Sequence, residues 1–174
     1  MTVVQIREKD ADTGEFYDVA LKSKAICDKV SSVNSFAVLV RAVTDLAIPS
    51  QYSVPLIIND RVDVFLAVSQ SSPSPPLAGM HIGQSDLPHA VARQLLDTAG
   101  YTDAVIGVSC GNVQEAQAAK RDGADSIGIG AVWWTGSKKL KKDAMGVRGV
   151  EAVVKAFGGP AVAIGKHEPC RVAD

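Results

Sequence analysis

The sequence predicts an α/β fold, a TIM (β/α) barrel in which about six of the eight βα units can be recognised. Strand-like apolar runs alternate with helix-like segments along the 174 residues, which predicts parallel strands covered by helices. Aromatic residues make up 5% of the chain, while Ala, Val, Ile and Gly abound, as in buried parallel sheets. The strands end in polar residues or glycine, as they do where barrel enzymes place their chemistry.

The first two βα units are predicted near the start of the chain. A strand is expected at Val3–Glu8, followed by a helix over Gly14–Lys29 whose apolar residues recur on one side. A second strand is expected at Val54–Asn59, followed by a helix over Val62–Val68. The rival architecture, an open doubly wound sheet, is less favoured because no GxGxxG motif follows the first strand.

The third unit pairs a strand at Gly79–Gly83 with a helix over Leu87–Thr98. Asp86 is expected to be the N-cap of this helix, with Pro88 in its first turn.

The fourth unit has clear signals at the ends of its helix. A strand at Ala104–Ser109 leads to a helix over Val113–Arg121, with Asn112 as its N-cap and Gly123 after its end.

The remaining units comprise a strand at Ser126–Val132, a helix over Val147–Phe157 and a strand at Pro160–Gly165. These short strands, each followed by a turn, continue the barrel pattern.

We expect one domain over residues 1–174, interrupted by segments that do not fit the pattern. Residues 30–51 form an oversized apolar connection and are interpreted as an insert outside the working fold, such as a retained intron. Residues 69–78 are rich in Ser and Pro and are expected to form a loop. Residues 166–174 are expected to be a tail.

The composition excludes several classes of function. With 18 basic and 19 acidic side chains, the chain has no electrostatic reason to bind nucleic acid or an anionic membrane. The sequence contains no apolar stretch long enough to span a membrane, and its start does not resemble a signal peptide. Cys27, Cys110 and Cys170 are widely spaced and form no CxxC motif, so we expect a reducing, cytoplasmic location.

Two polar clusters stand where predicted strands end. Gln5, Arg7 and Lys9 alternate and therefore point to one face of the first strand, where an anion such as diphosphate would offset their charge. Asn59 and Asp60 end the next strand and offer the hard oxygen ligands that Mg²⁺ prefers beside phosphates. The alternative is an edge strand that carries ordinary surface charges.

Several motifs stand in order along the chain: Val4-Gln5-Ile6-Arg7-Glu8-Lys9, Pro55-Leu56-Ile57-Ile58-Asn59-Asp60-Arg61, Met80-His81-Ile82-Gly83-Gln84-Ser85-Asp86, Ile106-Gly107-Val108-Ser109-Cys110 and Gly123-Ala124-Asp125-Ser126-Ile127-Gly128-Ile129-Gly130. In this order they resemble thiamine phosphate synthase. Its fungal form is resembled by Ala131-Val132-Trp133, Lys138-Lys139-Leu140 and Gly146-Val147-Arg148-Gly149. The resemblance implies an incomplete TIM barrel that joins hydroxymethylpyrimidine diphosphate to hydroxyethylthiazole phosphate and releases diphosphate. The hydroxyethylthiazole kinase often fused to the fungal synthase is absent from this sequence.

The resemblance also assigns roles to individual residues. It implies catalytic roles for Arg7, Lys9 and Lys138, and Mg²⁺ binding by Asp60 and Asp86. The substrate-binding residues that it implies are Gln5, Arg7, Lys9, Asn59, His81, Ser109, Thr135, Ser137, Lys138 and Gly165.

Some of these residues also have structural interpretations. Asp86 by itself would be an ordinary helix cap, His81 a core histidine, and Lys138 part of a solvated basic loop. Ser109 has no base nearby in the sequence, which argues against a nucleophile.

The sequence also departs from the family. The strand that normally precedes the Gln5 strand is not visible, and Lys166 replaces the second of two glycines that normally follow the seventh strand. Three functions therefore remain open: a synthase, a catalytically inactive fragment of this family, and a thiazole tautomerase. Retention of the diphosphate residues argues against the tautomerase. A homo-oligomer is one option for assembly.

Overall fold

The computed structural model describes most of the chain. The described residues are 4–7, 10–28, 38–40, 55–72, 77–133 and 144–165, with backbone alone at 38–40. The chain divides into two compact units, Met1–Ile106 and Gly107–Asp174. The boundary falls within one strand, β5 (Val105–Cys110). The prediction of one domain over 1–174 stays a prediction.

The first unit contains four parallel strands. They are β1 (Val4–Ile6), β2 (Val38–Val40), β3 (Leu56–Asn59) and β4 (Gly79–Ile82), and they pair in the order β2-β1-β3-β4. All three pairings are parallel, as expected where a helical connection returns the chain to the same end of the sheet. Three of the strands were predicted, with bounds that differ by one to a few residues.

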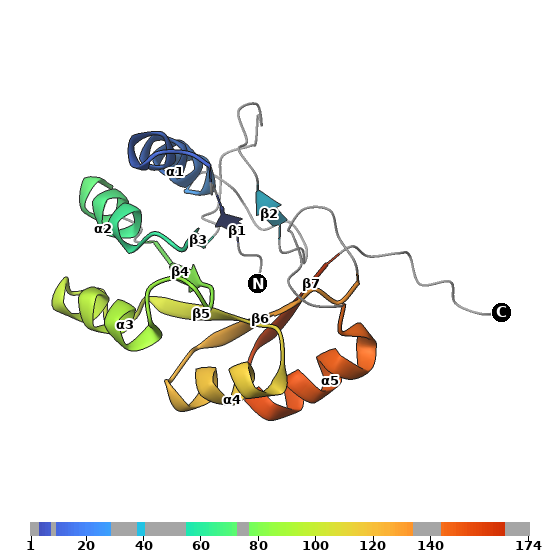
Figure 1. Ribbon diagram of the computed structural model, residues 1–174. Helices are drawn as coiled ribbons and strands as arrows, with labels where there is room; N and C mark the ends of the chain where they lie inside the picture. The colour runs from blue at the N-terminus through green and yellow to red at the C-terminus, as the bar shows by residue number, and fades with distance from the viewer. Residues whose placement is uncertain are drawn as a thin grey trace. The chain divides into compact units, whose positions relative to one another are not determined.

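Three helices follow these strands and pack along one side of them (Figure 1). They are α1 (Thr13–Cys27), α2 (Val62–Ser71) and α3 (His89–Thr98). Between them and the strands lie Ile6, Ile58 and Met80, all fully buried. Because side chains alternate along a strand, the residues between these apolar positions point to the opposite face. That face carries the predicted site.

The strand β2 was missed because it lies inside residues 30–51, which were interpreted as an insert. Val38–Val40 pair with Val4–Ile6 on the side of β1 that faces away from β3. A strand at this position satisfies the outer backbone groups of β1, which would otherwise form an open sheet edge. The other residues of 30–51 lie outside the described part of the chain.

The Ser/Pro-rich loop begins later than predicted because α2 continues to Ser71. Ser69 is fully buried on this helix, and packing of this kind overrides the low helix propensity of serine. Among the described residues, no atom forms a hydrogen bond with the Ser69 hydroxyl. Residues 73–76 lie outside the described residues.

The substitution Ser69→Ala is therefore expected to raise the free energy of unfolding by about 1 kcal/mol, because it removes a buried polar group that has no partner. Urea unfolding followed by circular dichroism measures the change. Ser71→Ala on the same helix is the control, since the exposed Ser71 hydroxyl bonds to the Tyr17 hydroxyl at 2.8 Å. It should change the stability by less than about 0.5 kcal/mol. A loss of stability in Ser69→Ala would contradict the interpretation.

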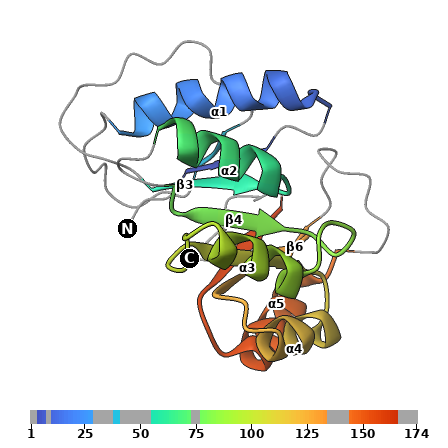
Figure 2. The same cartoon turned by 90° about the vertical axis from the view of Figure 1, so that its left-hand side faces the viewer.

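The second unit contains the later part of β5 and two further strands. β6 (Ser126–Gly130) pairs with β5 and with β7 (Ala161–Ile164), and both pairings are parallel. The helices α4 (Val113–Arg121) and α5 (Gly146–Phe157) pack against each other (Figure 2).

The caps of α4 follow the sequence signals. Asn112 is the N-cap of α4, as predicted, and its side chain accepts a hydrogen bond from the Glu115 amide at 2.9 Å. Gly123 adopts a positive φ of 85° just after the helix, as glycine does at such ends. In the described part of the chain, no helix has the length and apolar character that a membrane crossing needs.

Candidate functional site

Three of the predicted site residues share one face of the first unit. Gln5 on β1 and Asn59 on β3 bond directly, with the Gln5 Nε2 donating to the Asn59 Oδ1 at 2.5 Å. His81 lies in register with Asn59 on the neighbouring strand β4, so their side chains leave the sheet on the same side. The structure therefore brings Gln5, Asn59 and His81 together at the carboxyl ends of three adjacent strands.

Arg7 follows the end of β1 and continues the alternation that places Gln5 on this face. Its side chain is half-buried. Lys9 lies outside the described residues, as do Thr135, Ser137 and Lys138. The roles implied for these four residues and for Arg7 stay predictions.

His81 is buried, with 8% of its surface exposed, and β4 is buried along its whole length. Its backbone carbonyl accepts a hydrogen bond from the Asp60 amide at 2.8 Å. The histidine thus belongs to the wall of the candidate site and to the core of the sheet at once. Both interpretations made from the sequence are compatible with this position.

Asp60 has an unusual backbone. Its φ is 63°, and it is the single non-glycine residue with a positive φ in the described ranges of the chain. The Arg61 amide donates to the Asn59 carbonyl at 2.8 Å, which closes a tight three-residue turn centred on Asp60. Such conformations cost of order 1–3 kcal/mol and cluster at functional sites. Apart from the tolerance of Asp for positive φ, no residue pattern predicts this turn.

The predicted helix-cap role of Asp86 is wrong. The helix α3 begins at His89 with Pro88 as its N-cap, so Asp86 lies before the helix. The Asp86 Oδ2 instead accepts a hydrogen bond from the Gly83 amide at 2.8 Å. This bond turns the carboxylate back toward the end of β4.

Gly83 is a site residue that the sequence reasoning missed. A Cβ at this position would lie 2.7 Å from the Asp86 Oδ2. The carboxylate can approach the Gly83 amide only because the glycine has no side chain. A glycine three residues before a predicted metal ligand was the available signal.

The substitution Gly83→Ala is therefore expected to displace the Asp86 carboxylate while the fold persists, because the clashing atom is the end of a movable side chain. We expect the affinity for magnesium diphosphate to fall about tenfold, measured by isothermal titration calorimetry. The melting temperature should change by less than about 4 °C. Unchanged affinity would show that the position of Asp86 is irrelevant to binding.

In the second unit, Ser109 lies near the end of β5, and a compact polar network follows it. The Glu115 carboxylate accepts hydrogen bonds from the Gly111 amide at 2.7 Å and from the Asn112 side chain at 2.6 Å. Together with the N-cap bond of Asn112, these form a reciprocal capping arrangement at the start of α4. Asn112 and Glu115, three residues apart, were a readable signal for it.

Cys110, next to Ser109, is buried, and burial raises the pKa of its thiol to about 11. The nearby Glu115 carboxylate acts in the same direction. The thiol is therefore protonated at neutral pH and unsuited to nucleophilic attack.

Gly165 follows β7 at a point where two backbone segments approach closely. A Cβ at Gly165 would lie 3.0 Å from the Val132 amide nitrogen and 3.3 Å from that of Trp133. The Val132 amide also donates to the Ile164 carbonyl at 3.1 Å. The close approach explains a glycine at this position, while its role in phosphate binding stays a prediction.

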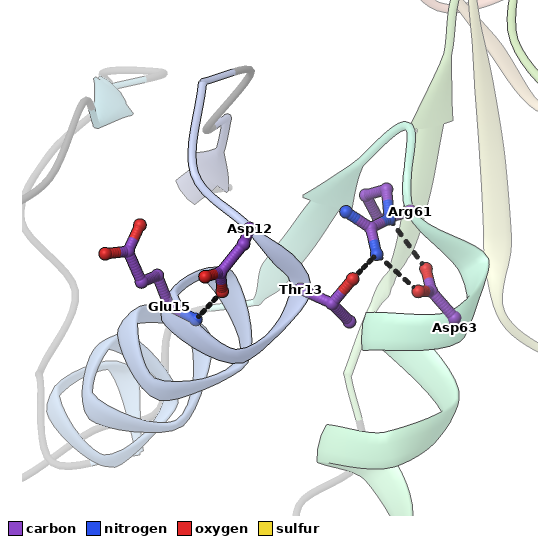
Figure 3. Close-up of polar contacts among 5 residues, drawn as sticks. All are labelled: Asp12, Thr13, Glu15, Arg61 and Asp63. Atoms are coloured by element: carbon purple, nitrogen blue, oxygen red, sulfur yellow. Dashed lines mark hydrogen bonds and ion pairs between the residues drawn. The ribbon is translucent and has the colours of Figure 1, made fainter.

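A second network lies beside Asp60 (Figure 3). The Arg61 guanidinium donates to both carboxylate oxygens of Asp63, at 2.9 and 2.5 Å, and to the Thr13 hydroxyl at 2.5 Å. Hydrogen bonding from Arg61 lowers the pKa of the Asp63 carboxyl, while partial burial opposes this shift. On the adjacent helix, the Asp12 side chain caps α1 by accepting from the Glu15 amide at 2.9 Å.

No group of three His, Cys, Asp or Glu side chains comes together as a metal site within the described residues. The two predicted ligands Asp60 and Asp86 nevertheless suit Mg²⁺, which commonly takes one or two carboxylates and completes its shell with water and substrate phosphates. Both follow adjacent strands, and both are held by backbone contacts at the ends of these strands.

Comparison with known proteins extends these observations. The sequence model of the family "Thiamine monophosphate synthase" matches residues 28–174. A thiamine-phosphate synthase from Clostridium novyi is 37% identical over 164 residues, which cover 94% of this chain and 64% of that protein. One from Clostridium botulinum is 38% identical over 165 residues, which cover 95% of this chain and 64% of that protein.

Comparison of the fold with solved structures finds a similar enzyme. The structure of a thiamine phosphate pyrophosphorylase from Pyrococcus furiosus is similar, with a TM-score of 0.67 and 25% sequence identity, and the match covers 95% of this chain and 63% of that one. The predicted fold class, a TIM (β/α) barrel with part of its units, is thereby confirmed, and the doubly wound alternative is set aside. The chain spans 63–64% of the length of these relatives, which is less than two thirds. On the match of its sequence to the family model, the chain belongs to the thiamine monophosphate synthase family.

Proposed function

We propose that this chain acts in thiamine biosynthesis as a thiamine-phosphate synthase. It would join hydroxymethylpyrimidine diphosphate to hydroxyethylthiazole phosphate, with release of diphosphate. The observation that carries the proposal is the polar constellation of Gln5, Asn59 and Asp60 at the ends of β1 and β3, in a chain of this family. Its relatives are named for this activity.

The chemistry explains why these residue types would be needed. Departure of diphosphate concentrates negative charge on the leaving group, so preorganised donors that meet this charge accelerate the step. Gln5 and Asn59 are already oriented by their mutual hydrogen bond. Arg7 and Lys9 would add positive charge, and the Arg7 fork suits a bidentate contact with phosphate oxygens.

Asp60 and Asp86 would hold Mg²⁺ at the ends of β3 and β4. The metal, when bound, would neutralise diphosphate charge. Asp60 is held by the turn that its neighbours close, and Asp86 by the Gly83 amide. These contacts support the proposal because metal ligands need fixed orientations to favour one cation geometry.

The other assignments rest on the family resemblance. His81 would contact the pyrimidine, Ser109 and Lys138 the diphosphate, and Thr135, Ser137 and Gly165 the thiazole phosphate. We further propose a cytoplasmic location, which rests on the cysteine pattern. The assembly state, including a homo-oligomer, stays a prediction.

The test combines the full chain with both substrates and Mg²⁺, and it detects thiamine phosphate by fluorescence after oxidation to the thiochrome form. We expect product to require all three components and to disappear when a chelator removes the metal. Omission of either substrate is the control for carried-over product. Absence of product from a cooperatively folded chain would contradict the proposed activity and favour a catalytically inactive member of the family.

A further inference from the structure

The turn at Asp60 needs external support because its backbone is unfavourable. A three-residue turn with a positive φ at its centre persists when surrounding contacts hold it. Two backbone bonds of 2.8 Å act on this turn, from the Asp60 amide to the His81 carbonyl and from the Arg61 amide to the Asn59 carbonyl, and the Arg61 carbonyl accepts a third from the Phe65 amide at 3.0 Å. The second bond places Arg61 at the end of the turn.

The Arg61 side chain connects this turn to two helices. Its Nε and Nη2 donate to the two oxygens of Asp63 in the first turn of α2, and its Nη2 also donates to the Thr13 hydroxyl at the start of α1 (Figure 3). The helices α1 and α2 pack against each other, so these acceptors belong to one packed layer. The bidentate contact fixes the direction of the guanidinium as well as its distance.

An arginine beside a diphosphate site would ordinarily be expected to bind the anion. Here the guanidinium forms its bidentate contact with the Asp63 carboxylate and also bonds to Thr13. It therefore points toward the starts of α2 and α1. The pair is partly exposed, with 33% of the Arg61 side chain and 52% of the Asp63 side chain accessible. Exposed ion pairs contribute little to the free energy of unfolding of the whole chain. The Arg61–Asp63 contact is therefore better explained as one that holds the local backbone conformation.

We propose that Arg61 is a positioning residue that holds the turn at Asp60, and with it the Asp60 carboxylate, by anchoring the turn to Thr13 and Asp63. The use of this turn for binding rests on the proposed function. The anchoring itself does not, because it concerns hydrogen bonds within the chain.

Two measurements on the full chain test the anchoring. Hydrogen exchange of the Asp60 and Arg61 amides, followed by NMR, reports the opening of the turn. In Arg61→Ala, we expect both amides to exchange at least about tenfold faster, while the melting temperature changes by less than about 4 °C. Arg61→Lys keeps the charge without the fork and should restore the slow exchange only in part. Asp63→Ala should resemble Arg61→Ala.

Titration with magnesium diphosphate reports the consequence for the site. Arg61→Ala should weaken binding about tenfold. Lys155→Ala is the control, since Lys155 forms an ion pair with Glu151 at 2.7 Å on α5 that lies on the surface and is more exposed than the Arg61–Asp63 pair. It should change neither the exchange of the two amides nor the affinity.

The outcomes separate this inference from the proposed function. Exchange rates of both amides that remain unchanged in Arg61→Ala overturn the anchoring. Faster exchange with unchanged affinity overturns the positioning of the site. If the unsubstituted chain does not bind magnesium diphosphate, the proposed function fails, and the exchange rates alone decide whether Arg61 holds the turn.

Discussion

Replacement of Arg7 by alanine is expected to lower the rate of thiamine phosphate formation about a hundredfold, as loss of a preorganised electrostatic contact typically does. Arg7 continues the polar face of β1 beyond Gln5, and that face also carries Asn59. Charge on the diphosphate would grow as the bond breaks, so in the proposed reaction the Arg7 guanidinium would stabilise the transition state more than the bound substrate. Steady-state kinetics should show the loss mainly in kcat.

Arg121→Ala is the control for Arg7. Arg121 is exposed in the last turn of α4, where the ordinary result of a substitution is little change. In Arg121→Ala the rate of thiamine phosphate formation should stay within about twofold of that of the unsubstituted chain. Asp60→Ala should match Arg7→Ala in size, because it removes the proposed Mg²⁺ ligand. Equally small effects of all three substitutions would show that the diphosphate site is misplaced.

Replacement of Gly79 by alanine is expected to cause the largest loss of stability, about 3 kcal/mol or more. A Cβ at Gly79 would lie 2.0 Å from the Val105 carbonyl oxygen and 2.7 Å from the Val105 nitrogen. These are backbone atoms, and the Val105 amide also donates to the Ala78 carbonyl at 2.9 Å, so the neighbouring segment cannot move without losing that bond. Urea unfolding measures the change, with exposure of the protein to limited proteolysis as a second readout.

Gly14→Ala provides a control of opposite sign. Gly14 lies in α1, where a Cβ would meet only the Asp12 Oδ1 at an ordinary 3.4 Å. Alanine restricts the unfolded chain and favours the helix, so the free energy of unfolding should rise by up to about 0.5–1 kcal/mol. If Gly79→Ala unfolds at the same urea concentration as the unsubstituted chain, the close approach of the two segments is not a constraint.

The alternation of strands and helices could be predicted from the sequence, because burial of one face makes apolar residues recur at a spacing typical of each element. The helix at Val113–Arg121 has the bounds that were predicted, since Asn112 and Gly123 mark both of its ends with local chemistry. The face of Gln5 and Asn59 was also predictable, because alternation along a strand needs no knowledge of its neighbours. The pairing of β2 with β1 was not predictable, because nothing in the sequence of Val38–Val40 indicates which strand they pair with.

The sequence by itself determined the family, the βα order and the polar side chains that end the strands, because these depend on residue type and spacing. The tertiary structure decided how the side chains are held. Arg61 ends the turn at Asp60, and its side chain bonds to Asp63. Asp86 accepts a hydrogen bond from the Gly83 amide and is not a helix cap. The structure also places the backbone of Val105 so close to Gly79 that a side chain there would collide with it. These contacts join residues through packing and backbone geometry, and their free energies depend on distances that no local pattern of residues encodes.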